Sequence, residues 1–296
     1  MIRPAAPMER DPLALDRVPL SPATFDALRN LLHAHSGIAL AHHKITMVQS
    51  RLAKRLRALG LRSYEQYHDL LRDPQAEEWP EFVNALTTNL TSFFREGHHF
   101  TRLVELLKPA YATSKRIRIW SAGCSTGEEP YTLAMTLTKA FGASASIQIL
   151  ATDLDTAVLN TASRGIYPIA RVESLADEWK RLGFLRGKGE NHDQVRIRPE
   201  LRKLVTFTQM NLLDAVWPLE GGPFQAIFCR NVMIYFDKPT QKRILERFVP
   251  LMKPDALLFS GHSENLGFVT DLFRLQKKTV YQLQANASQR GRAGLC

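Results

Sequence analysis

A segment near the middle of the chain, residues 117–153, most constrains the fold. It begins with a short apolar run, passes through a loop containing Gly123 and Gly127, continues with a helical pattern, and ends in a second apolar run closed by Asp153. Strand, glycine loop, helix, strand and acid is the order of a nucleotide- or nucleoside-binding βαβ unit. The glycines let the backbone approach a ligand, and the acid lies where a ribose hydroxyl needs an acceptor. We therefore predict an α/β fold with its ligand at this loop.

The same loop also matches the G-x-S-x-G nucleophile elbow of serine hydrolases, with Ser125 at its centre and His262 later in the chain. A hydrolase of that fold has several strands before the elbow, whereas the sequence before residue 117 has a helical pattern. The sequence also lacks an oxyanion motif of the HGGG type. Both observations oppose a serine hydrolase, which stays as an alternative because the motif itself matches. A P-loop is excluded because no lysine follows the glycines at the required spacing.

The composition is that of a soluble globular protein, with 296 residues, 45% of them hydrophobic and 23% charged. No apolar run approaches the about 18 residues of a membrane span. The first twenty residues lack the continuous apolar stretch of a signal peptide. The three cysteines, Cys124, Cys229 and Cys296, are scattered, which predicts a reducing cytoplasm, no disulfide framework and no metal site.

The pattern along the chain predicts two folded domains. We expect, in chain order, a disordered arm at 1–20, an all-α N-terminal domain at 21–88, a linker and helix at 89–112, an α/β domain at 113–285 and a tail at 286–296. In the first domain, Ser21 and Pro22 predict a helix start, and the clearest helix runs from Lys44 to Leu59 before Gly60. Two shorter helices are expected at 64–71 and 77–86.

The α/β domain carries an insertion at about 167–203. An amphipathic segment, a glycine turn and an alternating apolar run occur there, and the stretch is too long for a simple loop, so we predict a small antiparallel β subdomain. A helix ending at Gly165 precedes it. The α/β pattern then resumes with strands expected at 205–209, 226–229, 256–260 and 279–283, and a helix at 240–252.

Polar residues follow each predicted strand of the sheet. These are Ser121 to Gly127, Asp153, Asn211 and Leu212, Arg230 and Asn231, and Gly261 and His262. Because open α/β sheets bind ligands at the carboxyl ends of their strands, the series predicts a binding site at one edge. Helix capping is the alternative for single members, since Thr126 and Glu129 fit a capping box and Asp153 is placed to cap the next helix.

Five runs of sequence closely resemble the chemotaxis receptor methyltransferase family, CheR. They are Asn89–Arg95, Trp120–Tyr131, Ala151–Asp155, Phe228–Asp237 and Ser260–Asn265, and the resemblance spans residues 20 to 285. It implies a Rossmann-like domain that uses S-adenosylmethionine as methyl donor, releases S-adenosylhomocysteine and needs no metal. The implied acceptors are glutamate side chains on the cytoplasmic helices of chemoreceptors, which become methyl esters in chemotaxis adaptation.

The resemblance also implies which residues line the cofactor site. They are Asn89, Thr91, Arg95, Gly123, Glu129, Asp153, Asn211, Leu212, Arg230 and Asn231. Asp153 would hold the ribose and Glu129 the methionine ammonium group. Arg95 and Tyr235 are the catalytic candidates near the transferred methyl group, with Arg95 steering the substrate carboxylate. A glutamate has an ordinary pKa of about 4.3 and attacks as an anion, so no general base is expected.

A basic window in the N-terminal domain suits an acidic partner. No acidic residue occurs between Asp26 and Glu65, and the net charge of the chain is +10. On a helical wheel the basic residues Lys44, Arg51 and Arg55 cluster beside the apolar stripe of the expected helix, with Lys54 a little further round. We predict that these four side chains dock the acidic receptor helices.

The inserted subdomain resembles the family's receptor-tethering module, so a receptor C-terminal tail peptide is a second candidate partner. The expected location is the cytoplasm, with recruitment to membrane receptor arrays and no membrane insertion. A nucleic-acid methyltransferase is the main rival, although neither an aromatic platform nor an N-P-P-Y motif is seen. A receptor-binding adaptor without activity is the other rival, and the full set of cofactor-contacting residues opposes it.

Overall fold

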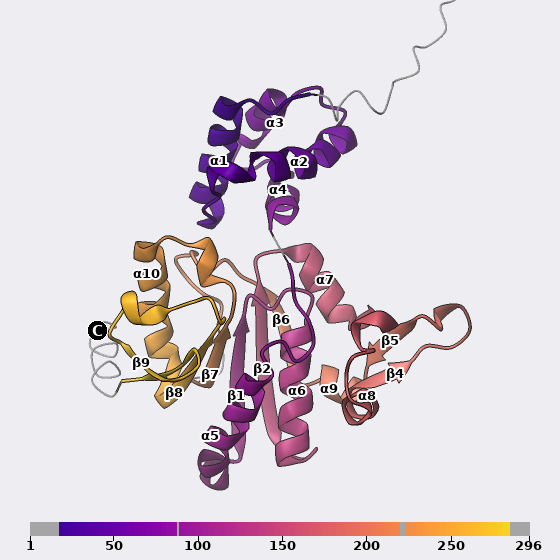
Figure 1. Cartoon of the computed structure of the whole chain (residues 1–296), viewed down its shortest axis with the longest axis vertical. Helices are drawn as coiled ribbons and strands as arrows, with labels where there is room; N and C mark the ends of the chain where they lie inside the picture. The colour runs from indigo at the N-terminus through magenta and orange to yellow at the C-terminus, as the bar shows by residue number, and fades with distance from the viewer. Residues whose placement is uncertain (1–17, 88, 220–222, 285–296) are drawn as a thin grey trace, which may run out of the picture. The chain divides into compact units, whose positions relative to one another are not determined.

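The computed structural model describes residues 18–87, 89–219 and 223–284, and the chain divides into two compact units at Thr87 (Figure 1). The first unit is helical and the second contains the α/β sheet, which confirms the predicted fold class. Most of the expected arm and all of the expected tail lie outside the described residues. The last residues of the expected arm are ordered, because Leu20 is buried and the carbonyl of Val18 accepts a hydrogen bond from Gln49.

The N-terminal unit has four α-helices in its described residues. They are α1 (Pro22–Ser36), α2 (Ile45–Leu59), α3 (Tyr64–Leu71) and α4 (Trp79–Leu86), and the 3-10 helix η2 (His42–Lys44) leads into α2. The Ser21 hydroxyl accepts the backbone N–H of Thr24, so the predicted cap of α1 is confirmed. Leu52 and Leu56 of α2 are buried with Phe82 of α4, which explains the apolar stripe that revealed these helices.

Two of the four predicted docking residues have structural partners within this unit. The Arg55 guanidinium donates to both carboxylate oxygens of the buried Glu78, at 2.8 and 2.7 Å, and this hydrogen bonding raises the pKa of Arg55. Arg51 donates to two backbone carbonyls at the end of α4. Both cations therefore hold helices of this unit together, and the receptor docking expected of them stays a prediction. Lys44 and Lys54 are exposed and keep the docking prediction.

The α/β unit is built on a sheet whose described strands lie in the order β6-β2-β1-β7-β8-β10-β9. Their bounds are β1 (Arg116–Ala122), β2 (Ser146–Asp153), β6 (Val205–Gln209), β7 (Phe224–Cys229), β8 (Met252–Ser260), β9 (Phe273–Lys277) and β10 (Val280–Leu283). The first five strands in that order are parallel, and β10 and β9 add antiparallel pairs. β9 was not predicted because only Phe273 of its residues is buried, so it shows no apolar alternation.

Helices cover both faces of this sheet. They are α5 (His98–Ser114), α6 (Glu128–Phe141), α7 (Thr156–Arg164) and α10 (Lys238–Phe248). Ile117 and Ile119 of β1 belong to the core shared with α5, α6 and α7, whereas Trp120 and Ala122 belong to the core shared with α10. This alternation follows from the two-residue period of a strand. Because helices cover both faces of the sheet, a ligand is expected at the carboxyl ends of the parallel strands. There the loops after β1, β2 and β7 lie next to one another.

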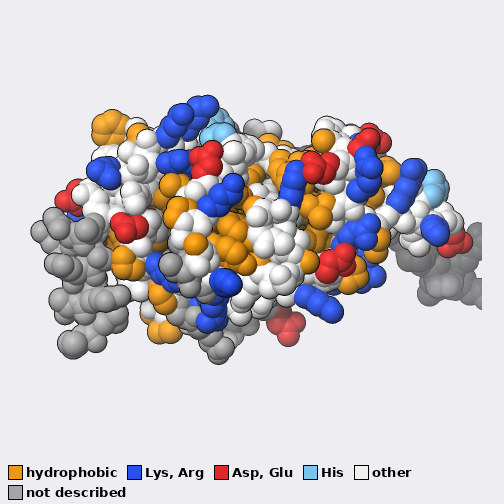
Figure 2. Space-filling model, turned by 90° about the horizontal axis from the view of Figure 1, so that it is seen from below, with side chains coloured by type: hydrophobic (Ala, Val, Ile, Leu, Met, Phe, Trp, Pro, Cys, Tyr) orange, Lys and Arg blue, Asp and Glu red, His pale blue; other side chains and the backbone are white. Residues whose placement is uncertain are grey.

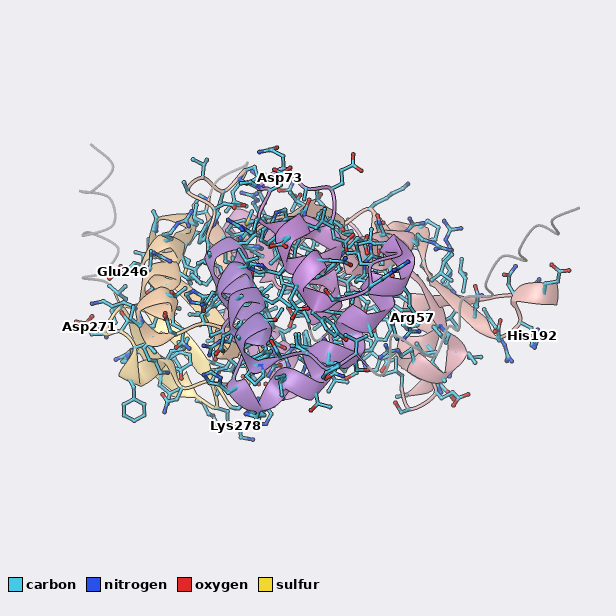
Figure 3. All side chains as sticks on the ribbon, turned by 90° about the horizontal axis from the view of Figure 1, so that it is seen from above. Arg57, Asp73, His192, Glu246, Asp271 and Lys278 are labelled. Atoms are coloured by element: carbon cyan, nitrogen blue, oxygen red, sulfur yellow. The ribbon has the colours of Figure 1, made fainter. Side chains whose placement is uncertain are left out.

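The insertion forms the predicted small antiparallel subdomain. Its strands β3 (Ile166–Pro168), β4 (Phe184–Arg186) and β5 (Gln194–Ile197) lie in the order β3-β5-β4, accompanied by the helices α8 (Asp177–Gly183) and α9 (Pro199–Arg202). Figure 1 shows the β4–β5 hairpin extending sideways from the main sheet. Figure 3 places His192 near its outer tip. β3 and β4 are the edge strands of this sheet, and Leu185 and Arg186 of β4 are exposed.

Candidate functional site

The predicted polar strand ends meet at the carboxyl edge of the parallel strands. The amides of Gly123 and Cys124, after β1, both donate to the carbonyl of Thr152 near the end of β2. The amide of Met210, after β6, donates to the carbonyl of Asp153. Backbone hydrogen bonds thus fix the loops after β1, β2 and β6 to one another, which gives the side chains on them defined positions.

The loop after β1 requires glycine at one position. Gly123 has a φ of +81°, and a Cβ added there would lie 2.3 Å from a methyl group of Val232. Only glycine therefore allows the loops after β1 and β7 to approach this closely. The capping-box alternative for this loop is wrong: α6 is preceded by Gly127, and the Thr126 hydroxyl donates to the side chain of Glu128 at 2.6 Å.

Asp153 is the last residue of β2, and its carboxylate is turned to the glycine loop. It accepts the backbone N–H of Ser125 at 2.8 Å and that of Asp155 at 3.0 Å. Removal of the carboxylate from water raises the pKa of Asp153 to about 6. The alternative that Asp153 caps the following helix is wrong, because Asp155 caps α7 and also accepts the Asn89 amide at 2.8 Å. Asp153 therefore remains available to a ligand.

Glu129, in the first turn of α6, and Arg230, directly after β7, form an ion pair that is largely withdrawn from water. The Glu129 carboxylate accepts the Ser121 hydroxyl at 2.6 Å and an Arg230 N–H at 3.0 Å. Burial raises the pKa of Glu129, and the positive charge of Arg230 opposes that rise. Arg230, with only 3% of its side chain exposed, also donates to the carbonyl of Arg95 and lies 3.5 Å from Glu96. The pair thereby reaches the linker before α5.

Two members of this network, Glu96 and His99, were missed in the sequence. Burial acts to raise the pKa of Glu96, but Arg230 and the hydrogen bonds from His262 outweigh it and lower that pKa. His99 is fully buried, and burial followed by the charge of Arg230 lowers its pKa to about 4. For Glu96 the available signal was an acid directly after the matched run Asn89–Arg95. Single acidic residues at a helix start are common, so the signal was weak.

Glu264 is a third residue that sequence analysis did not select, although it lies in a matched run. This buried carboxylate accepts the backbone N–H groups of Asn231, Ile234 and Gly261 at 2.9, 3.2 and 2.6 Å. Asn231 has a φ of +60°, an unusual conformation that these bonds stabilise. Glu264 therefore fixes the loop after β7 to the end of β8 and sets the position of Tyr235, which ends the 3-10 helix η5 (Met233–Tyr235).

The remaining predicted site residues lie on the linker and on the loop after β6. The Arg95 guanidinium donates to the carbonyl of Leu90 at 2.7 Å, and the carbonyl of Thr91 accepts a hydrogen bond from Arg171. Asn211 accepts the backbone N–H of Leu213 through its side chain, and Leu212 is buried. The structure thus shows Arg95 held by its own segment.

The serine hydrolase alternative lacks its catalytic pair. The Ser125 hydroxyl lies 3.4 Å from the carbonyl of Asn89, and the ring of His262 contacts Glu96. In the described ranges, no group of three or more His, Cys, Asp or Glu side chains is arranged to hold a metal ion. Among the same residues, no helix has the length and apolar character required to cross a membrane.

Comparison with protein families decides the class of enzyme. Residues 89–282 match the S-adenosylmethionine-binding domain of CheR methyltransferases, and residues 23–87 match the all-α domain of the same family. The chain belongs to the CheR methyltransferase family. The predicted family, methyl donor and enzyme class are confirmed: this is an S-adenosylmethionine-dependent methyltransferase of chemotaxis, and the hydrolase and nucleic-acid alternatives are not favoured.

Several relatives are similar to the chain over most of its length. The chemotaxis protein methyltransferase of Klebsiella aerogenes is 51% identical, and the alignment covers 90% of this chain and 91% of that protein. Chemotaxis protein methyltransferase 2 of Pseudomonas aeruginosa is 49% identical, with coverages of 87% and 91%. The Escherichia coli chemotaxis protein methyltransferase is 48% identical, with coverages of 90% and 93%. All three match across both units of the CheR chain.

The charge of the binding edge fits S-adenosylmethionine, which carries a positive sulfonium and an ammonium group. The carboxylates of Glu129 and Asp153 lie at this edge, and both have pKa values raised by removal from water. Arg230 shares its charge between Glu129 and Glu96. These carboxylates have too little positive charge around them in the protein alone, so a bound cation would stabilise their ionised forms.

We expect Glu264→Gln to destabilise the α/β unit by about 2–3 kcal/mol, because the amide nitrogen of glutamine would face a backbone N–H that now donates to a carboxylate. Urea unfolding measures this change. Glu246→Gln is the matched control, since Glu246 is exposed on the outer side of α10 (Figure 3). Equal stability of the two variants would contradict the role of Glu264 in fixing the loop.

Proposed function

We propose that this CheR protein transfers a methyl group to glutamate side chains on the cytoplasmic helices of chemoreceptors, forming glutamyl methyl esters. The names of its relatives support action in chemotaxis. The observation that carries the choice of acceptor is the state of the histidines near the site. His99 is buried with a lowered pKa and His262 contacts Glu96, so an acceptor that is already anionic suits this edge better than one that must first lose a proton.

When bound, S-adenosylmethionine supplies a methyl group on a positively charged sulfur, and its transfer to a carboxylate oxygen moves no proton. Glutamate, with an ordinary pKa of about 4.3, is ionised at neutral pH. The chain therefore only has to bind and orient the two reactants and exclude water from them. The buried Arg230–Glu129 pair and the hydrogen bonds to Glu264 hold the loops that do this.

We assign the cofactor contacts as follows. The oxygens of Asp153 each accept one backbone N–H in the protein and have lone pairs left for ribose hydroxyls. Glu129 receives the methionine ammonium group, and the charge of Arg230 favours the ionised form of that carboxylate. The other proposed contacts surround these two groups and are Asn89, Thr91, Arg95, Gly123, Asn211, Leu212 and Asn231.

Arg95 and Tyr235 are the residues that we propose to act at the transferred methyl group. The backbone carbonyl of Arg95 accepts a hydrogen bond from Arg230, while its guanidinium donates to the carbonyl of Leu90 in the same linker. That side chain can therefore turn to a substrate carboxylate without breaking an ion pair. Tyr235 is half-buried at the end of η5, on the loop that Glu264 fixes.

Receptor contact is proposed at two places outside the cofactor site. Lys44 and Lys54 are exposed basic groups in a stretch of sequence, from Asp26 to Glu65, that has no acidic residue between its ends, and this suits the acidic receptor helices. The exposed edge of β4 suits a receptor C-terminal tail peptide that would add as another strand. Hydrogen exchange of β4 with and without such a peptide tests the second contact. Both contacts would recruit the enzyme to receptor arrays from the cytoplasm.

The chemical nature of the product tests the acceptor. Receptor membranes methylated with labelled S-adenosylmethionine should release labelled methanol in mild alkali, because a carboxyl methyl ester is hydrolysed there whereas a methylated nitrogen is stable. The reaction without enzyme is the control. A base-stable label would exclude glutamate esters and favour the nucleic-acid or amine alternatives.

The affinity for S-adenosylhomocysteine should fall as the pH drops below about 6. Ribose hydroxyls donate to the ionised form of Asp153, whose pKa in the protein is about 6, so each lower pH unit should weaken binding by up to about tenfold. The same raised pKa stabilises the ligand-free fold at low pH, and that contribution is lost as the pH rises through 6. Calorimetry across pH 5 to 8 measures the binding profile. In Asp153→Asn the affinity should no longer change with pH around 6. A pH dependence equal to that of the unaltered protein would show that Asp153 does not bind the ribose.

Reversing both docking charges, with Lys44→Glu and Lys54→Glu together, should weaken receptor methylation at low salt and leave cofactor affinity unchanged. Arg95→Ala should instead lower turnover at saturating receptor. Basic side chains are also spread over other surfaces, as Figure 2 shows for one face. Lys242→Glu with Arg243→Glu on α10 is therefore the charge-matched control. Equal losses in both double variants would show that only net charge matters.

A further inference from the structure

The linker that carries Asn89, Thr91 and Arg95 packs on the inserted β subdomain. The ring of Phe93 lies edge-to-face with Tyr167 of β3 and with Phe184 of β4, at centroid distances of 5.1 and 5.0 Å. The next residue, Phe94, packs against Trp179 of α8 at 4.6 Å. Two successive aromatic side chains of the linker are thus held by three different elements of the subdomain.

Arg171, which ends the 3-10 helix η3 (Ile169–Arg171) of the subdomain, adds a polar contact to the same linker. Its guanidinium donates to the carbonyl of Thr91 at 3.1 Å and lies 3.8 Å from one oxygen of Glu128. Glu128 is fully buried, and that oxygen has no hydrogen-bond partner among the described residues. A buried carboxylate needs a compensating charge, and Arg171 supplies it from outside the glycine loop.

Tyr167 reaches the glycine loop directly. Its hydroxyl donates to the carbonyl of Thr126 at 2.7 Å, and a Cβ added at Gly127 would lie 3.0 Å from the same hydroxyl oxygen. The loop that precedes α6 is therefore closed on one side by a side chain of β3. Together, Tyr167 and Arg171 join the subdomain to both segments that are proposed to hold the cofactor.

We propose that Arg171 and Tyr167 are positioning residues of the cofactor site, so that the inserted subdomain forms part of the cofactor-binding machinery. Arg171 holds the linker through Thr91 and the glycine loop through Glu128. Tyr167 holds the glycine loop through Thr126. Without them, a buried carboxylate and two backbone carbonyls lose partners, and both segments relax from the geometry that binds the ligand. The proposal rests on the placement of S-adenosylmethionine at the loop and linker.

The first test is the affinity of each variant for S-adenosylhomocysteine, measured by calorimetry on the full chain. Arg171→Gln should bind about tenfold more weakly than the unaltered protein, and Arg171→Lys should recover part of the loss because it keeps the charge. Tyr167→Phe, which keeps the packing ring, should weaken binding several-fold. Arg196→Gln is the control, because Arg196 is exposed on β5 of the same subdomain.

The second test separates positioning from general stability. In the ligand-free protein, hydrogen exchange of residues 89–95 and 123–129 should become faster in Arg171→Gln and Tyr167→Phe, while the strands β1, β7 and β8 keep their protection. Affinities equal to that of Arg196→Gln would overturn the proposal, as would faster exchange throughout the unit. Failure of the unaltered protein to bind S-adenosylhomocysteine would instead overturn the proposed placement of the cofactor.

Discussion

The ion pair between Arg230 and Glu129 is the interaction on which the site depends. Arg230 follows the buried strand β7, and its guanidinium is withdrawn from water, so it must find anionic and carbonyl partners within the protein. It finds Glu129 on α6, Glu96 before α5 and the carbonyl of Arg95. One buried cation thus joins the sheet, the helix after the glycine loop and the linker, which are the three sources of the proposed cofactor contacts.

Around this pair the acids outnumber the cations, and the imbalance explains the direction of the pKa shifts. The pKa values of Asp153 and Glu129 are raised because burial removes water from these carboxylates without supplying enough positive charge. The pKa of Glu96 is lowered because the charge of Arg230 and the hydrogen bonds from His262 outweigh its burial, and His99 stays neutral because burial and the same arginine lower its pKa. An edge of this kind favours a cationic ligand. Once that ligand is bound, its positive charge in turn attracts an anionic acceptor.

The N-terminal unit shows why a cluster of basic residues in a sequence does not by itself locate a docking surface. Arg55 is committed to the buried Glu78, which also accepts a hydrogen bond from Tyr67, and Arg51 closes the end of α4. Both arginines are twenty or more residues away from their partners in the chain, so the helical wheel placed them correctly beside the apolar stripe without showing what they contact. The two lysines of the cluster, Lys44 and Lys54, are exposed.

Sequence alone determined the α/β class, the parallel strands, the helical N-terminal unit, the inserted antiparallel sheet and the polar strand ends, because apolar periodicity and glycine position are local properties. It also determined the family, through the matched runs. Only the tertiary structure decided which acid caps α7, that Glu96, His99 and Glu264 hold the loops at the strand ends, and that two arginines of the basic window have partners within the helical unit. It also decided that Arg171 and Tyr167 contact the linker and the glycine loop. These outcomes depend on contacts between residues far apart in the chain. Such contacts are selected by the need to pair buried charges and backbone groups, which no local pattern records.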